Sequence, residues 1–473
     1  HPHIQYHHKQ DRSKMLPDLL ASSECFALRA EHNGQFLQSV QPPVYLGSRI
    51  EASADTTAGN ARAWFFLEPS KEHQGLVHIR YCHNNAYWVL VANYHDGHRY
   101  MCAADEPQED LSRESCTLFE FIPVNGKENN IRLRIPQIGP HGGYASMVPV
   151  FDISKPYLQF HLTAESSFTV IGLSRKNQLP TLIALKSDNG WYLRHVGTWL
   201  KFDTHDIKNE GVAYSVHTND DGTVLIMTDK GGFWSRRSSD WVSADGTLAN
   251  SKDQNPDMVF KVITGDGLIA LQNMGNHKFC NRLNYEGISY LSASADTKSI
   301  WTWFVLEEPI IHREIFDFVF HLDEARIYKN EIIVVGTHQQ TNDTTSEQAC
   351  TFSFTAKKEV VTTWETVVSF NTTIDKMLAS HVSKIPTIVG GEVTLSHKPE
   401  GDSEEITVTE NYTVPPGKTV TAKFVTMHGS CDVPYSYSQK DVLANGEEVT
   451  TFHEDGIYTC VNTYNLPITV TES

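Results

Sequence analysis

The chain has 473 residues, which is enough for about three domains with separate hydrophobic cores. It carries 39 Lys and Arg against 57 Asp and Glu, and the resulting net charge of −18 opposes binding to nucleic acid or to an anionic bilayer. No apolar run approaches the roughly 18 residues that a membrane-spanning helix needs. None of the eight cysteines forms a close CxxC pair, so a structural zinc site is not expected.

The first residues are rich in histidine, and residues 1–19 are expected to form a disordered or extended segment. Four of these histidines are candidates for metal binding, but a tag-like terminus explains them more simply, so no metal or cofactor is expected. The chain begins with His1 rather than Met, which indicates that the true start is missing. Secretion is therefore neither indicated nor excluded.

A unit of apolar strand, turn and aromatic strand occurs three times in the middle of the chain. Its copies start at Leu182, Val224 and Leu268, which are 42 and 44 residues apart. Each copy closes with a second apolar strand, over residues 212–216, 258–263 and 303–306. A propeller needs about four or more blades, whereas three hairpin-rich units suit a β-trefoil, a barrel capped by hairpins. We therefore expect a β-trefoil over residues 176–307.

The first part of the chain repeats this scheme more loosely. Apolar strands start at Phe26, Val77 and Ile131, and closing strands are expected over residues 64–67, 118–122 and 168–171. Asn-Gly and Gly-Gly pairs between apolar runs are typical of hairpin turns, because these residues accept positive φ at little cost. The pattern predicts another β-trefoil over residues 20–175, with longer loops.

The composition changes after about residue 308. Only one tryptophan, Trp364, follows this point, and residues 308–473 contain 25 Thr and 11 Ser. Apolar residues alternate with polar ones over 350–354 and 420–424, which is typical of half-exposed strands. Asn445-Gly446 and Asp455-Gly456 predict hairpins, and helical periodicity is weak and confined to residues 316–327. The third domain, residues 308–473, is expected to be all-β and elongated.

Motifs that carry catalysis are missing from the sequence. There is no GxSxG, HExxH, P-loop or GxGxxG opening a helix. Single histidines such as His195 and His217 are more often strand or surface residues than catalytic bases. We therefore expect no enzymatic activity, and a hydrolase hidden in the trefoil loops stays a disfavoured alternative.

Two loops carry the residue types that a sugar site uses. An aromatic ring stacks on the apolar C–H face of a pyranose, and amide groups satisfy its hydroxyls. Residues 84–88 (Asn-Asn-Ala-Tyr-Trp) and 230–234 (Lys-Gly-Gly-Phe-Trp) combine these features. Core packing is at least as good an explanation for any one of the rings. The candidate carbohydrate-binding residues are Asn84, Asn85, Tyr87, Trp88, Phe233 and Trp234.

Residues 26–37 and 78–88 resemble the agglutinin domain of amaranthin-like plant lectins, which pairs two β-trefoils in tandem, and residues 182–306 resemble its second copy. The runs 412–420, 429–437 and 455–459 resemble the aerolysin-like module that is fused to such lectins. The resemblance implies binding of galactose or N-acetylgalactosamine glycans at a site where the first trefoil of one subunit meets the second trefoil of another in a homodimer. It also implies a cytoplasmic or nucleocytoplasmic location and a role in plant defence.

Carried onto this sequence, the resemblance assigns Asn85, Tyr87 and Trp88, with Asn84 adjacent, to sugar binding. The second trefoil departs from the family pattern, because Gly232, Phe233 and Trp234 stand where an amide and a tyrosine are expected.

Aerolysin-like proteins assemble into a ring in which each subunit inserts an amphipathic hairpin into the membrane. The best candidate for such a hairpin here is residues 371–391, although its alternation is poor and Pro386 would interrupt a strand. An ordinary amphipathic surface hairpin is an equally good interpretation of residues 371–391. A pore-forming toxin whose trefoils serve only for targeting, and a non-lytic multivalent binding protein, are the alternatives to a lectin with an inserting module.

Two further features stay open at this point. The sequons at Asn342, Asn371 and Asn411 would be glycosylated only in the secretory pathway. Cys431 and Cys460 lie in segments that could pair as neighbouring strands, but the sequence does not fix any disulfide.

Overall fold

The computed structural model describes residues 23, 25–41, 48–137, 142–149, 154–162, 166–173, 178–248, 254–265, 268–358, 361–366, 375–377, 382–384, 392–395, 404–465 and 468–473. This part of the chain is all-β, as expected, and its helical elements are three-residue 3₁₀ turns: η2 (Ala61–Ala63), η4 (Pro256–Met258) and η5 (Leu322–Glu324). In these residues, no helix has the length and apolar character needed to span a membrane. The predicted N-terminal segment, residues 1–19, lies outside the described residues.

The first sheet has twelve strands, six of which close into a ring. The closing pairings run β1–β12, β12–β9, β9–β8, β8–β5, β5–β4 and β4–β1. The hairpins β2–β3, β6–β7 and β10–β11 extend from this barrel. The strands are β1 (Cys25–Ala30), β2 (Phe36–Val40), β3 (Arg49–Ala54), β4 (Phe65–Pro69), β5 (Val77–Tyr81), β6 (Tyr87–Ala92), β7 (Arg99–Ala104), β8 (Leu118–Pro123), β9 (Asn130–Ile135), β10 (Gly143–Val148), β11 (Tyr157–His161) and β12 (Phe168–Leu173).

The second sheet repeats this topology with another twelve strands. Its ring runs β13–β24, β24–β21, β21–β20, β20–β17, β17–β16 and β16–β13, and its hairpins are β14–β15, β18–β19 and β22–β23. The strands are β13 (Leu182–Lys186), β14 (Tyr192–Val196), β15 (Trp199–Thr204), β16 (Tyr214–Thr218), β17 (Val224–Thr228), β18 (Phe233–Arg236), β19 (Val242–Gly246), β20 (Phe260–Gly265), β21 (Leu268–Asn273), β22 (Phe279–Tyr285), β23 (Ile288–Ala295) and β24 (Phe304–Glu307).

The two rings contain the strands that the repeats predicted. In the second barrel, β13, β17 and β21 begin at Leu182, Val224 and Leu268, the predicted starts of the three copies. The closing strands predicted over 212–216, 258–263 and 303–306 overlap β16, β20 and β24. The repeat period therefore identified the strands that form the barrel wall.

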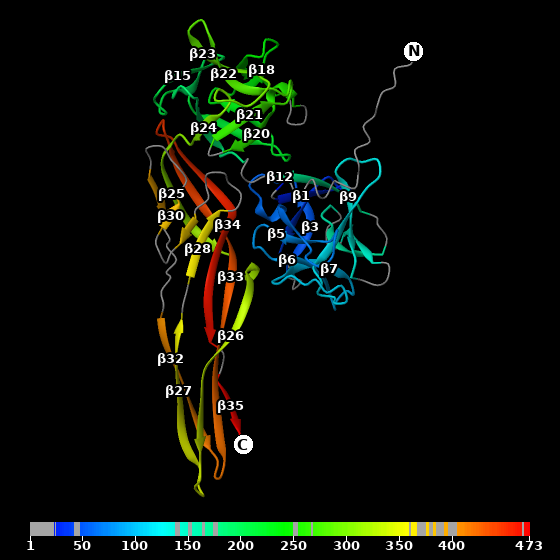
Figure 1. The fold of residues 1–473 in the computed structure, drawn as a ribbon, viewed down its shortest axis with the longest axis vertical. Coiled ribbons are helices and arrows are strands. Elements are labelled where there is room, and N and C mark those ends of the chain that lie inside the picture. The colour runs from blue at the N-terminus through cyan, green and yellow to red at the C-terminus, as the bar shows by residue number, and fades with distance from the viewer. Residues whose placement is uncertain are drawn as a thin grey trace.

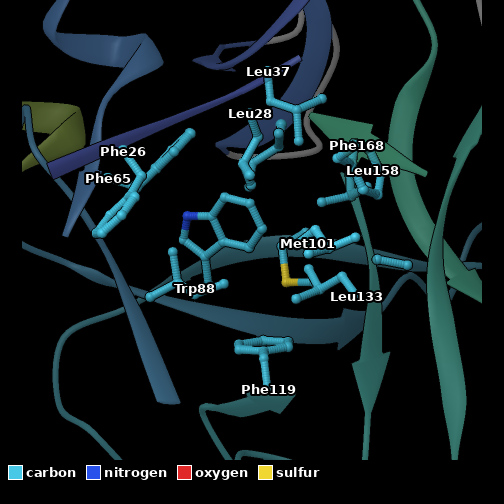
Figure 2. Close-up of a cluster of buried hydrophobic side chains, with 14 of the residues drawn as sticks. Phe26, Leu28, Leu37, Phe65, Trp88, Met101, Phe119, Leu133, Leu158 and Phe168 are labelled. Atoms are coloured by element: carbon cyan, nitrogen blue, oxygen red, sulfur yellow. The ribbon is translucent and has the colours of Figure 1, made fainter. Parts of the chain in front are cut away.

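Each barrel encloses its own apolar core. The first contains Phe26, Leu28, Phe65, Trp88 and Phe119 (Figure 2). The second core is built in the same way around Trp234, Phe260 and Phe304. Alternate residues of each barrel strand point inward, because successive side chains of a strand face opposite sides of the sheet.

The third part of the chain is a long sheet with a separate two-stranded sheet, β27–β32, packed against β33. Figure 1 shows the second barrel at one end of the long sheet, the first barrel beside it, and the pair β27–β32 towards the opposite end. The strands are β25 (Ile310–Phe320), β26 (Arg326–Thr341), β27 (Gln348–Lys358), β28 (Val361–Thr366), β29 (Asp375–Met377), β30 (Val382–Lys384), β31 (Glu392–Leu395), β32 (Glu404–Val414), β33 (Thr419–Leu443), β34 (Glu448–Asn465) and β35 (Thr469–Glu472). The longest, β33, pairs with β25, β26, β34 and β35 and so runs through the whole sheet.

The weak helical pattern over residues 316–327 corresponds to the end of β25, the 3₁₀ turn η5 and the start of β26, which agrees with the expected all-β domain. One local prediction for this region is wrong. Asp455-Gly456 is not a turn and lies inside β34. Gly456 stands opposite Tyr435, whose ring would collide with any larger side chain there, so the glycine makes room for a ring.

Other predictions for this region hold. Residues 350–354 and 420–424 lie in β27 and β33, and Asn445-Gly446 forms the turn between β33 and β34. Cys431 lies directly opposite Cys460 on neighbouring strands.

The candidate insertion hairpin and the sequons are covered only in part. Within residues 371–391 the structure describes β29 and β30, which pair antiparallel, and the rest of this segment, including Asn371 and Pro386, lies outside the described residues. Asn342 is completely buried and its amide donates to two backbone carbonyls, so the folded chain has no room for a glycan there. Asn411 is exposed in β32.

Candidate functional site

The two tryptophans of the predicted sugar loops lie inside the barrels. Trp88, in β6, is 0% exposed, and its ring packs edge-on against Phe65 with 4.9 Å between centroids (Figure 2). Trp234, in β18, is also 0% exposed and packs edge-on against Tyr214 at 5.0 Å. A ring that stacks on a sugar needs an open face. Core packing, the alternative left open for these rings, is therefore what the structure shows, and neither ring is exposed on a rim loop.

The turn between β5 and β6 holds the two predicted amides against the third sheet. Asn85 adopts a φ of 61°, and the Asn84 side-chain oxygen accepts a hydrogen bond from the backbone of Ala86 at 3.0 Å. The Asn84 amide donates to the backbone oxygen of Glu324 at 2.9 Å, and the Asn85 amide donates to the Asp432 carboxylate at 3.2 Å. Both amides therefore hydrogen-bond to the third part of the same chain.

A buried ionic cluster lies beside this turn. Arg62 is the middle residue of η2, and Glu324 is the last residue of η5. The Arg62 guanidinium forms a bidentate pair with the Glu324 carboxylate, with one N–O distance of 2.6 Å. His83 Nε2 donates to the same carboxylate at 3.1 Å, and both His83 and Glu324 are buried. The cluster joins the first barrel to the third sheet through one carboxylate.

The surroundings of this cluster shift the pKa values of its members. Burial alone would raise the pKa of Glu324, but hydrogen bonds from His83 and Arg62 and the nearby positive charge outweigh it and lower the pKa to about 2. Burial lowers the pKa of His83, against the opposing effect of its hydrogen bond to Glu324. We therefore assign an ionised Glu324 between a charged Arg62 and a neutral His83.

Tyr87 is also covered by the third sheet. Its hydroxyl donates to Glu68 at 2.9 Å, and the guanidinium of Arg326 lies 5.2 Å from the centre of its ring. Arg326 is held there by a hydrogen bond to the backbone oxygen of Asp105 at 2.7 Å and by stacking 3.8 Å above Tyr328. The ring is buried, so Tyr87 lies with Asn84 and Asn85 on the surface of the first barrel that contacts the third sheet. We call this surface, with Arg62, His83 and their partner Glu324, the docking surface.

The second predicted loop lies elsewhere. Phe233 is half-buried, and its ring lies 6.1 Å from that of His217 within the second barrel. Figure 1 shows β18, which carries this loop, well away from β6 in the first barrel. The two loops therefore do not form one site within a single chain.

A cavity of about 720 Å³ lies where the three parts of the chain meet. Its walls include Thr57 from the first barrel, His217 from the second and Asp441 from the third sheet. The first two walls are tied together by Asp220, which accepts a hydrogen bond from the backbone of Thr57 at 3.0 Å. The third sheet is tied to the first barrel by the pair of Arg62 and Glu324. Direct contacts as well as the connecting chain therefore hold the three parts together.

Sequence reasoning missed Arg62, His83 and Glu324, the ionic residues of the docking surface. Arg62 and Glu324 are 262 positions apart, so no local spacing connects them. A signal would have to come from paired changes of the two residues in related sequences.

In the described part of the chain, no group of three or more His, Cys, Asp or Glu side chains is placed to hold a metal ion.

Comparison with known proteins finds a family model that matches part of the chain. Residues 23–147 match the family model of the Agglutinin domain, which confirms the resemblance drawn from residues 26–37 and 78–88. No curated protein matches the chain.

Among solved structures, a mosquitocidal holotoxin has a TM-score of 0.29 and 11% identity over 64% of this chain and 36% of its own. The chain thus spans about a third of the length of that protein. Lamprey immune protein has a TM-score of 0.26 and 15% identity over 73% of this chain and 87% of its own.

Proposed function

We propose that this protein is a carbohydrate-binding lectin in which residues 20–175 and 176–307 form two β-trefoils and residues 308–473 form an aerolysin-like module. The observation that carries the proposal is the match of residues 23–147 to the Agglutinin domain. The closed ring of six strands with three hairpins, present in both barrels, supports the same architecture for the second barrel. The proposed activity is binding and not catalysis.

The proposed ligands are glycans that end in galactose or N-acetylgalactosamine, as the family resemblance implies, and the proposed role is in plant defence. Two barrels per chain, and a homodimer of such chains, would turn weak single sites into useful avidity. Trp88 and Trp234 have no sugar-binding role in this proposal because they are buried. Asn84, Asn85, Tyr87 and Phe233 remain predicted sugar contacts, and the first three would need the docking surface to open.

The alternative function is a membrane-perforating protein that the barrels only target. It is favoured by the long strands β26, β33 and β34, and by the antiparallel pair β29–β30 inside the segment proposed to insert. Such a protein would assemble into a ring before insertion. Ring assembly would also be required if the lectin and the module act together.

A glycan array with the full chain tests the lectin proposal. We expect binding to galactose- or N-acetylgalactosamine-terminated glycans that free galactose competes away at millimolar concentration. Binding to no glycan on the array would refute the proposal. Release of dye from vesicles that carry the bound glycan, together with detergent-resistant oligomers, would favour the membrane-perforating alternative.

A further inference from the structure

Four aromatic rings form an exposed cluster on the hairpins of the second barrel. Trp199 begins β15, Trp241 precedes β19, Tyr285 ends β22 and Tyr290 lies in β23. Trp199 is 49% exposed and Tyr285 57% exposed, and the other two are half-buried. Ring centroids lie 5.6 Å apart for Trp199 and Tyr290, 5.5 Å for Trp241 and Tyr290, and 6.1 Å for Trp241 and Tyr285. We call these four residues the aromatic platform.

The strand register places the platform on one face. Lys201 lies opposite Tyr290, and Trp199, two residues earlier on the same strand, lies opposite Ser243. Side chains directly opposite each other, or two residues apart on one strand, point to the same side of a sheet. The rings therefore form a continuous surface, although they come from three separate hairpins.

The hairpin that carries two of the rings closes in a tight turn. Tyr285 pairs with Ile288, and the two residues between them, Glu286 and Gly287, have φ values of 51° and 80°. Positive φ at both central residues is typical of the tight type I′ turn that fits the twist of the flanking strands. A tight turn restricts the backbone of the hairpin, which lowers the entropy lost when a ligand binds.

Polar groups border the platform on the same face. Ser243 accepts a hydrogen bond from Arg237 Nε at 2.7 Å and donates to Asp245 at 2.9 Å. Arg237 and Asp245 also form an ion pair, and both side chains remain partly exposed. The Lys201 ammonium lies 5.7 Å from the centre of the Tyr290 ring. Apolar rings and hydrogen-bonding groups thus lie next to each other on one surface.

We propose that the aromatic platform and its polar border are a glycan-binding surface, a proposal that rests on the proposed lectin function. The exposed rings of Trp199 and Tyr285 offer faces for the C–H patches of pyranose rings, while Arg237, Asp245 and Lys201 offer partners for hydroxyl groups. Buried rings would serve the core instead, and contiguous exposed apolar surface of this kind marks interaction sites.

The observations favour a glycan over a bilayer surface as the occupant. The net charge of −18 opposes approach to an anionic membrane. Insertion of the platform into a bilayer interface would also remove water from the adjacent ion pair of Arg237 and Asp245, which costs free energy. A neutral hydroxylated ligand can instead replace that water with hydrogen bonds.

Substitution of the exposed rings tests the proposal. Binding of the full chain to immobilised galactose- and N-acetylgalactosamine-terminated glycans is measured for Trp199→Ala, Tyr285→Ala and the double variant. The matched control is Trp301→Ala, because Trp301 is in the same barrel and is 50% exposed but lies outside the platform. We expect each platform variant to lose at least about tenfold in affinity, while the control stays within about twofold of wild type.

The other outcomes separate this proposal from the one on which it rests. If the double variant folds, as judged by an unchanged thermal transition, and binds glycans like wild type, the platform is not the site although the lectin function stands. If wild type binds no glycan, the lectin proposal itself fails, and this one with it. If wild type binds glycan-free phosphatidylcholine vesicles and Trp199→Ala does not, the occupant is a membrane and the glycan proposal is overturned.

Discussion

Replacing Trp88 with alanine is expected to lower the free energy of unfolding of the first barrel by about 3–5 kcal/mol, the usual cost of removing a large buried aromatic ring. The ring is completely buried and packs against Phe65 and Phe119 in the centre of the barrel, so its loss leaves a cavity that the surrounding strands cannot fill. Urea unfolding followed by circular dichroism measures the change. Trp88→Phe should cost much less, since most of the apolar ring is kept.

The control for this prediction is Trp301→Ala, which removes the same side chain from an exposed position and should leave the unfolding midpoint nearly unchanged. A Trp88→Ala variant as stable as wild type would contradict the buried position of this ring. A Trp88→Ala variant with wild-type stability that no longer binds glycans would identify the ring as a ligand contact, as the loop pattern originally indicated.

Replacing Glu324 with alanine is expected to cost about 3–5 kcal/mol at the contact between the first barrel and the third sheet, because it leaves Arg62 largely buried without its partner. His83 loses its acceptor in the same variant. We expect the first barrel to undock, which increases the radius of gyration in small-angle X-ray scattering and exposes the connection near Leu322 to protease. A matched surface control is Glu114→Ala, since the Arg99–Glu114 pair is largely exposed and contributes little.

Acid should weaken the same contact in the wild-type protein. The pKa of Glu324 is lowered from 4.5 to about 2 in the docked state, so the stabilisation from its ionised form is complete above pH 4.5 and is lost as the pH falls through about 2. The pKa of His83 is lowered as well, so docking already begins to weaken as the pH falls below its ordinary value of 6.5. Scattering profiles that stay compact from pH 7 to pH 2 would contradict the assignment of this cluster.

The barrel strands could be predicted from the sequence because their signal is local. Each copy of the repeat places an apolar strand, a turn and an aromatic residue within a short window, and starts such as Leu182 and Val224 begin strands of the ring. Turns were harder to predict than strands from the sequence. Asn445-Gly446 is a hairpin turn, whereas Asp455-Gly456 lies inside a strand, because glycine can serve either a positive φ or the space needed by a neighbouring ring.

The candidate site could be predicted only in part, because it depends on which way each side chain faces. Trp88 and Trp199 both lie near a strand end beside a turn, yet the first is buried in a barrel and the second is half exposed on a hairpin. Strand alternation separates the two faces but does not say which face a partner covers. The amides of Asn84 and Asn85 show the same limit, since their partners on the third sheet lie more than two hundred positions away.

Hydrogen–deuterium exchange of the full chain, with and without a bound galactose-terminated glycan, compares the two candidate surfaces in one measurement. If glycans bind at the hairpins of the second barrel while the first barrel stays docked on the third sheet, backbone amides near Trp199 and over residues 283–290 gain protection, and those over residues 83–88 do not change. Protection confined to residues 83–88, with no change near Trp199, would contradict this account and return the site to the first predicted loop.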